Sequence, residues 1–148
     1  TNNDLMERLT ANADQLQLGW TYWAWKYYDD PTGSSDEALV TPSGTLSPTA
    51  ASLSRAYPQA VAGTPVSFAF DPETAAFHLF YVPDAHVNAP TVIFVPVAVH
   101  YPQGYCAQVI GGTVISPRNA THLLIANGAK ASTVTVTVKP NPCTGSGL

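Results

Sequence analysis

Hydrophobic positions change their spacing once along this chain of 148 residues. Near the start, four apolar residues recur at helical intervals and would share one face of a helix: Leu5, Leu9, Ala13 and Leu16. This spacing predicts a helix over residues 4–17, and Gly19 follows as a stop. The run "GWTYWAW" at 19–25 then predicts a strand. A helix that leads directly into a strand is typical of an α/β fold.

After Tyr57 the helical period disappears, and short runs rich in β-branched and aromatic residues alternate with turn-forming residues. The runs cover residues 64–70, 75–82, 89–97, 104–110, 112–116, 120–126 and 132–138. Alternation is plainest in "TVTVTV" at 133–138, where every second residue is Val. About seven short strands separated by turns predict an antiparallel β-sandwich.

The two patterns divide the chain into two parts. One helix and one strand cannot cover their own apolar faces, so we interpret residues 1–46 as the end of a larger α/β domain whose earlier part is missing from this chain. Residues 47–148 would then form a complete β-sandwich domain. A polar loop at 29–47 and a short helical segment at 47–58 are expected to lead into its strands.

Charge and composition exclude several classes of function. Six Lys and Arg against ten Asp and Glu give a net charge of −4 with no basic stripe, so we expect no nucleic-acid partner. No signal peptide stands at the start, and no apolar run is long enough to span a bilayer. The four His residues lack the spacing of metal ligands, so no metal site is expected.

The two cysteines, Cys106 and Cys143, match no metal-ligand spacing either. They would form a disulfide in a secreted protein, or stay as two buried thiols in a cytosolic one. We expect the disulfide, because such a bridge would tie together several of the predicted strands. This expectation goes with a secreted, extracellular location.

All three Trp residues of the chain lie within "LGWTYWAWKYYDD" at 18–30. Alternate side chains of a strand face opposite sides, so Trp23 would share a side with Gly19 and Thr21, while Trp20 points to the other. In a (β/α)8 barrel, the small Gly19 and Thr21 would leave space beneath Trp23. We therefore expect Trp23 to face the barrel interior near the carboxyl end of the strand, where barrel enzymes place their chemistry.

An indole floor with a cation and phenols at its rim suits a sugar, because sugar C–H faces stack on indole while sugar hydroxyls need donors and acceptors. Trp23 is therefore the leading candidate for substrate binding. Trp25, Lys26 and Tyr27, at the start of the following loop, are further candidates. The alternative for each aromatic residue is core packing, and core packing is what we expect for Trp20.

The segment "GWTYWAW" after an amphipathic helix resembles the eighth strand of a glycoside hydrolase family 5 barrel. The runs "YYDDPTGSSDEALV" and "AYPQAVAGTP", which lead into the sandwich, resemble the endoglycoceramidase branch of that family. The opening "TNNDLMERL" is similar to the segment just after the seventh barrel strand of those enzymes. The resemblance covers nearly the whole chain, and the sandwich strands carry the least of it.

This resemblance implies that residues 1–46 are the last helix–strand part of a (β/α)8 TIM-barrel catalytic domain, followed by a C-terminal β-sandwich at 47–148. It implies retaining hydrolysis of the β-glycosidic bond between oligosaccharide and ceramide in glycosphingolipids, with Trp23 as the platform for the sugar beside that bond. Both family carboxyl groups would precede Thr1, so no catalytic residue is assigned in this chain. The implied partners are the glycosphingolipid and the missing N-terminal part of the barrel, with no metal or organic cofactor.

Two alternatives stay open at this point. The sandwich alone could be a non-catalytic module that binds carbohydrate or a lipid surface, through aromatic residues scattered over its strands. Alternatively, the enzyme could be a family 5 β-glucanase or a glucosylceramidase-like exo-enzyme. The local carboxylates Asp29 and Asp30 are expected to form turns in a solvated loop rather than a catalytic pair. Peripheral contact with lipid surfaces is compatible with the first alternative and with a glycolipid substrate.

Overall fold

The computed structural model describes residues 2–29, 31 and 37–141 of the chain. The chain divides into two compact units, Thr1–Ser54 and Arg55–Leu148, which we call the N-terminal unit and the sandwich unit. Each unit is described by itself. The assignment of domains to residues 1–46 and 47–148 stays a prediction.

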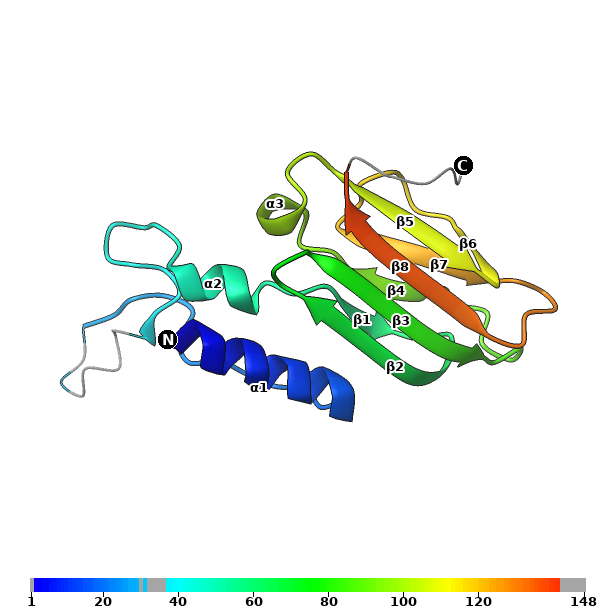
Figure 1. Cartoon of the computed structure of the whole chain (residues 1–148), viewed down its shortest axis with the longest axis horizontal. Coiled ribbons are helices and arrows are strands. Elements are labelled where there is room, and N and C mark those ends of the chain that lie inside the picture. The colour runs from blue at the N-terminus through cyan, green and yellow to red at the C-terminus, as the bar shows by residue number, and fades with distance from the viewer. Residues whose placement is uncertain (1, 30, 32–36, 142–148) are drawn as a thin grey trace. The chain divides into compact units, whose positions relative to one another are not determined.

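The sandwich unit consists of two antiparallel sheets of four strands each, stacked face to face (Figure 1). One sheet has the strand order β1-β4-β7-β6 and the other has the order β2-β3-β8-β5. The strands are β1 (Tyr57–Ala60), β2 (Gly63–Asp71), β3 (Ala76–Pro83), β4 (Thr91–Phe94), β5 (Tyr105–Ile110), β6 (Gly112–Val114), β7 (His122–Asn127) and β8 (Val134–Pro140). A short helix, α3 (Val97–His100), connects β4 to β5. The predicted antiparallel sandwich is confirmed, and each of the seven predicted runs overlaps one strand.

Strand β1 is the strand that the sequence pattern did not predict. Its four residues, "YPQA", contain Pro58, and the expected helical segment at 47–58 would have covered the first two of them. Pro cannot donate a ladder hydrogen bond and is therefore tolerated on edge strands. β1 lies at the edge of its sheet and pairs on one side only, with β4.

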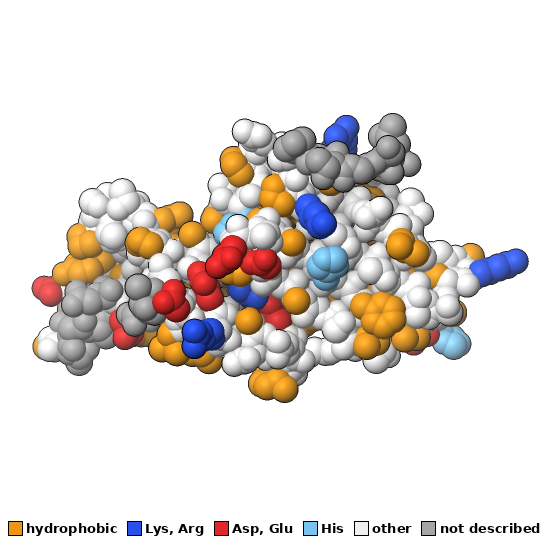
Figure 2. Space-filling model, viewed as in Figure 1, with side chains coloured by type: hydrophobic (Ala, Val, Ile, Leu, Met, Phe, Trp, Pro, Cys, Tyr) orange, Lys and Arg blue, Asp and Glu red, His pale blue; other side chains and the backbone are white. Residues whose placement is uncertain are grey.

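The core lies between the sheets and follows from side-chain alternation. In β8, Val134, Val136 and Val138 are fully buried, while the Thr residues between them point to the outer face. β3 pairs with β8 so that Leu79 lies opposite Val136, and Leu79 is also fully buried. The outer face of this sheet, turned toward the viewer in Figure 2, carries scattered apolar side chains among polar ones.

Polar contacts also join the two sheets. The Tyr81 hydroxyl, on β3, donates a hydrogen bond of 2.7 Å to Asn127 Oδ1, on β7 of the other sheet. Asn127 Nδ2 in turn donates to the carbonyl oxygen of Ala62 at 2.8 Å. The Ala62 N–H donates to Thr91 Oγ1 at 2.9 Å. This chain of hydrogen bonds satisfies polar groups at one side of a largely apolar core.

In the described part of the N-terminal unit there are two helices, α1 (Asn2–Leu16) and α2 (Pro48–Leu53). Pro48 begins α2, a position where its missing N–H costs nothing. The helices touch through polar side chains: Thr49 Oγ1 donates to Asn3 Oδ1 and Ser52 Oγ donates to Glu7 Oε1, both at 3.0 Å. α1 matches the predicted helix closely, whereas α2 ends well before residue 58.

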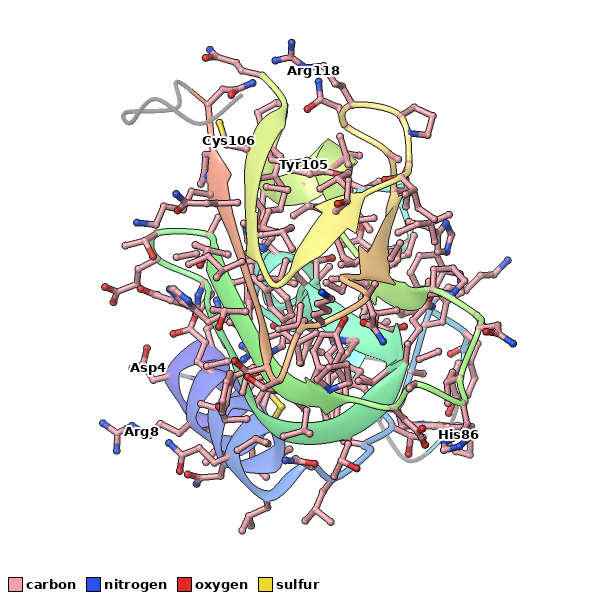
Figure 3. All side chains as sticks on the ribbon, turned by 90° about the vertical axis from the view of Figure 1, so that its right-hand side faces the viewer. Asp4, Arg8, His86, Tyr105, Cys106 and Arg118 are labelled. Carbon is pink, nitrogen blue, oxygen red and sulfur yellow. The ribbon has the colours of Figure 1, made fainter. Side chains whose placement is uncertain are left out.

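The apolar stripe predicted for the first helix is exposed in this chain. Leu5 and Leu9 are each 54% exposed and Leu16 is 68% exposed. Labelled polar residues of the same helix, Asp4 and Arg8, also project from its surface in Figure 3. α1 is therefore a helix whose apolar side is left open within the described residues.

The structure differs from the expectation at residues 19–25, because no strand forms there. A strand requires a ladder of backbone hydrogen bonds to a neighbour. Past the end of α1, the described backbone bonds of this segment begin only at Ala24, and they go to Leu39 and Val40. The β-rich composition therefore gives an extended segment without the regular pairing that would make it a strand.

The structure bears on two further expectations, the disulfide and the lack of a membrane-spanning segment. Cys106 is disulfide-bonded in the structure, but Cys143 lies outside the described residues, so their pairing stays a prediction. Figure 3 shows Cys106 beside Tyr105 at the opposite end of the sandwich from His86. No helix within the described ranges is long and apolar enough to cross a membrane.

Candidate functional site

The aromatic segment after α1 is the part of the N-terminal unit where large rings are most exposed. Trp23 is 64% exposed, Trp25 is 68% exposed and Trp20 is 43% exposed. Large apolar side chains that are exposed close together in the sequence are typical of binding or interaction sites. The aromatic segment, residues 18–28, is therefore the first candidate for a functional site.

Three backbone hydrogen bonds hold the centre of the aromatic segment. The N–H of Leu39 donates to the carbonyl of Ala24 at 3.0 Å, and the N–H of Val40 donates to that of Trp25 at 3.1 Å. The N–H of Tyr27 donates back to the carbonyl of Val40 at 2.8 Å. These bonds advance in the same direction along both stretches, so residues 24–27 run parallel to the returning chain.

A side chain anchors the start of the same stretch. The Tyr22 hydroxyl donates a hydrogen bond of 2.9 Å to the carbonyl oxygen of Glu37. Burial, followed by the nearby Glu37 carboxylate, raises the pKa of Tyr22 above its ordinary value. Tyr22 therefore stays a neutral donor at physiological pH and ties the segment to the end of the following loop.

Trp23 makes two specific contacts with Tyr28. Its indole Nε1 donates to the Tyr28 hydroxyl oxygen at 3.1 Å. The two rings also meet edge to face, with centroids 5.9 Å apart and planes at 84°. The peptide bond between Trp23 and Ala24 is cis. Because the indole N–H is already engaged, Trp23 offers a ligand its ring face rather than a donor.

Tyr28 was not among the candidates that sequence reasoning selected, although it lies in the quoted aromatic run. A contact between residues five apart follows neither helical nor strand periodicity, so no spacing rule points to it. The position of Tyr28 depends on the backbone bonds to Leu39 and Val40, which only the folded structure reveals.

The other predicted contact residues lie in the same segment but do not all share its exposure. Trp25 and Lys26 are exposed, and Tyr27 is half-buried. Of the local carboxylates, Asp29 is exposed, and Asp30 lies outside the described residues. The roles assigned to Trp23, Trp25, Lys26 and Tyr27 stay predictions.

The sandwich unit offers less for sugar binding. Among its aromatic residues, Phe70, Phe77 and Tyr81 are buried in the core, and Phe68 packs against it. A hollow of about 360 Å³ lies at one end of the sandwich, and its lining residues are 83–85, 87–90, 115, 126–129 and 131. None of the described residues that line this hollow is aromatic, so they offer no ring face on which a sugar would stack.

The described residues show no group that resembles a metal centre. They contain no cluster of three or more His, Cys, Asp or Glu side chains able to hold an ion. His86 lies in an exposed turn, where its ring Nδ1 and its backbone N–H are 3.0 Å and 2.8 Å from Asp84 Oδ1. These contacts, led by the backbone hydrogen bond, lower the pKa of Asp84. They form a local turn rather than a catalytic pair.

The chain is similar in sequence to a known protein family and to several curated proteins. Residues 55–139, nearly the whole sandwich unit, match the family model described as the glycoside hydrolase family 5 C-terminal domain. Endoglycoceramidase I of Rhodococcus hoagii (strain 103S) is 33% identical over 133 residues, which are 89% of this chain and 24% of that protein. The endoglycoceramidase of Hydra vulgaris is 30% identical over 131 residues, 87% of this chain and 25% of that protein.

Solved structures of an endo-glycoceramidase are also similar to this chain. Endo-glycoceramidase II from Rhodococcus sp., in complex with ganglioside GM3, is similar with a TM-score of 0.74 and 30% identity, over 94% of this chain and 28% of that one. The lactosyl-enzyme intermediate of the same enzyme gives a TM-score of 0.73. The chain thus spans about a quarter of the length of the curated relatives it matches.

Proposed function

The chain belongs to the family of glycoside hydrolase family 5 C-terminal domains, and from this premise we propose that it is part of a retaining glycoside hydrolase. The proposed reaction cleaves the β-glycosidic bond between oligosaccharide and ceramide in glycosphingolipids. The catalytic centre would be completed by residues outside this chain, which spans only about a quarter of its curated relatives.

The observation that carries the proposal is the exposed indole of Trp23, held by Tyr28 in an aromatic segment that contains every Trp of the chain. A free ring face with its N–H engaged suits the apolar face of a sugar. The relatives support this substrate class, since one of them was solved with ganglioside GM3 and as a lactosyl-enzyme intermediate.

In a retaining mechanism, one carboxylate attacks the anomeric carbon while a second carboxylic acid protonates the leaving oxygen. Water, activated by the second group as a base, then hydrolyses the glycosyl-enzyme and releases the sugar. We assign neither carboxyl group to this chain. Its residues would bind and orient: the Trp23 face would stack under the reacting sugar, and Trp25, Lys26 and Tyr27 would contact sugar hydroxyls and faces around it.

This mechanism requires no metal and no organic cofactor, because acid, base and nucleophile are all carboxyl groups. We further propose a secreted protein, in which a Cys106–Cys143 disulfide would form in an oxidising compartment. Residues 1–46 would supply the last helix and extended segment of the catalytic barrel. Within the described part of the chain, the open apolar side of α1 supports this role, because it offers Leu5, Leu9 and Leu16 for packing.

The test is an assay of the longer protein that carries this chain, with lactosylceramide in detergent micelles as substrate. The expected products are intact lactose and free ceramide in equal amounts. Release of galactose first, followed by glucose, would indicate an exo-enzyme instead. Binding of the micelles without hydrolysis would favour a non-catalytic module and would overturn the proposal.

Two variants of the longer protein test the part that this chain plays. Trp23→Ala should lower turnover by about 10²-fold, because a misplaced reacting sugar carries a cost of that order. Trp20 was expected to pack in a core but is 43% exposed in this chain, so Trp20→Ala serves as the matched indole control and should leave turnover per folded enzyme largely unchanged. Full activity of Trp23→Ala, or an exchange of the two phenotypes, would remove Trp23 from the site.

A further inference from the structure

The contact between Trp23 and Tyr28 defines the orientation of the candidate platform. We propose that Tyr28 is a positioning residue, which fixes the tilt of the Trp23 indole so that its face meets the reacting sugar. This inference rests on the proposed function, because it acts through the platform role of Trp23. It adds a residue whose effect is on catalysis and whose contact is with Trp23 rather than with the sugar.

Two independent contacts constrain the indole. The hydrogen bond from Trp23 Nε1 to the Tyr28 hydroxyl, at 3.1 Å, fixes where the nitrogen edge of the ring points. The edge-to-face contact, with planes at 84°, fixes the tilt of one ring against the other. A hydrogen bond alone would allow rotation about its axis, and a ring contact alone would allow sliding. Together they restrict the rotamers available to Trp23.

The partner ring is itself held in place by the backbone. Tyr28 directly follows Tyr27, whose N–H donates to the carbonyl of Val40 at 2.8 Å. Trp23 directly precedes Ala24, whose carbonyl accepts from Leu39 at 3.0 Å. Both ends of the Trp23–Tyr28 pair therefore lie next to peptide groups that are held by backbone hydrogen bonds. The backbone at both rings is fixed, and the contact between the rings restrains the side-chain torsions that remain.

This arrangement predicts how removal of the Tyr28 hydroxyl should affect the Trp23 indole. Trp23 is 64% exposed, so little packing restrains its indole besides the contact with Tyr28. Removing the Tyr28 hydroxyl would free the indole N–H to turn toward water and let the ring face leave its position. The sugar could still bind through its hydroxyls, but fewer bound molecules would be aligned for attack.

The first experiment uses the 148-residue chain with ¹⁵N-labelled tryptophan and follows its three indole N–H signals by NMR. Trp23→Phe removes one signal and thereby assigns it to Trp23. Tyr28→Phe should move this signal and speed its exchange with solvent, while the other two stay in place. Tyr57→Phe, at an exposed tyrosine of the sandwich unit, is the matched control and should move none of them. An unchanged Trp23 signal in Tyr28→Phe would overturn the inference.

The second experiment measures kcat and KM of the longer protein on lactosylceramide. Tyr28→Phe should lower kcat about 5- to 10-fold, the effect of one hydrogen bond, and change KM by less than about twofold. Tyr28→Ala, which also removes the ring, should lower kcat further. Tyr57→Phe should change neither constant. A loss caused only by poorer folding would appear as less active enzyme and would not move the Trp23 indole signal.

The outcomes separate this inference from the function on which it rests. If Trp23→Ala loses activity and Tyr28→Phe does not, the platform stands and the role of Tyr28 is overturned. If Trp23→Ala keeps full activity, the platform role itself fails, and the positioning role fails with it. If KM rises and kcat stays constant in Tyr28→Phe, Tyr28 contributes to sugar binding rather than to alignment, which also contradicts the inference.

Discussion

The two units of the chain differ in whether their large apolar side chains are buried or exposed. In the sandwich unit, Phe77, Leu79 and Tyr81 are completely buried between two sheets. In the N-terminal unit, Leu9 is 54% exposed and Trp25 is 68% exposed. The N-terminal unit is the poorer of the two in apolar residues, so composition does not explain why it exposes more of them. What differs is whether the unit supplies enough surface to cover its own apolar faces.

Buried apolar side chains stabilise the sandwich unit, whereas exposed ones in the N-terminal unit are available to bind something else. A buried aliphatic or aromatic side chain contributes about 1.5–3 kcal/mol by leaving water, and the sandwich unit realises this within itself. The exposed Leu and Trp side chains of the N-terminal unit do not realise it and remain available for other contacts. Large exposed apolar surface of this kind is typical of surfaces that bind a ligand or another part of a protein. The candidate site therefore lies in the unit that is less complete.

The largest expected effect compares one Leu from each unit. Leu79→Ala should lower the free energy of unfolding by about 2–5 kcal/mol, because it leaves a cavity in a fully buried position. Leu9→Ala should change the same free energy by less than about 0.5 kcal/mol, because its side chain is largely in water already. Urea denaturation of the 148-residue chain, followed by far-UV circular dichroism, measures both. Equal costs for the two variants would show that α1 has a covered apolar face in solution.

Most of the sandwich could be predicted from the sequence, because its local and tertiary signals agree. The alternation of Val134, Val136 and Val138 with Thr specifies both a strand and its buried side. β1 was not predicted, because Tyr57 and Pro58 lie at the end of a segment with a helical pattern. Only their pairing with β4 at a sheet edge makes them part of a strand. Pairing between distant segments is decided by the whole fold rather than by local pattern.

The candidate site was predictable in its residue types but not in its geometry. The concentration of Trp at 20–25 and the small residues before Trp23 pointed to a sugar site. Its expected strand geometry does not form, so the alternation argument for Trp23 against Trp20 lost its structural basis. The Trp23–Tyr28 contact depends on backbone hydrogen bonds between residues 24–27 and Leu39 and Val40. These bonds could not be predicted from the spacing of residue types along the sequence.

An intermediate effect should appear in the buried tyrosines of the sandwich unit. Tyr101 is fully buried, and its hydroxyl donates to the carbonyl of Ala75 at 2.8 Å. Burial, with a smaller contribution from Tyr105, raises the pKa of Tyr101 well above its ordinary value. Tyr101→Phe leaves the Ala75 carbonyl without this donor, so we expect a loss of about 1–3 kcal/mol at about pH 8. Tyr57→Phe, at an exposed tyrosine, should cost less than about 0.5 kcal/mol.

The same raised pKa gives a pH dependence with a definite sign. Below about pH 10 both the folded and the unfolded states keep the Tyr101 proton, and its contribution to stability is complete. Above that pH the unfolded state releases the proton while the folded state holds it, so the free energy of unfolding falls as pH rises. Denaturation midpoints measured from about pH 8 to about pH 11 should show this fall, and Tyr101→Phe should make it shallower. An unchanged slope in Tyr101→Phe would exclude Tyr101 as a cause.

The smallest expected effect is a fluorescence change that should be nearly absent. All three Trp residues lie in the N-terminal unit, and Trp23 and Trp25 are already mostly exposed, so unfolding of the sandwich should barely alter their emission. In a urea titration, far-UV circular dichroism should report a cooperative transition with little matching shift in Trp emission. The near-UV signal of the packed Tyr101 and Tyr105 rings, 5.7 Å apart, is the internal control and should vanish with the far-UV transition. A large blue-to-red shift of Trp emission at the same midpoint would mean that the indoles are covered in the native chain. The contrast between a closed sandwich and an open aromatic segment would then fail, and with it the availability of Trp23 in the isolated chain.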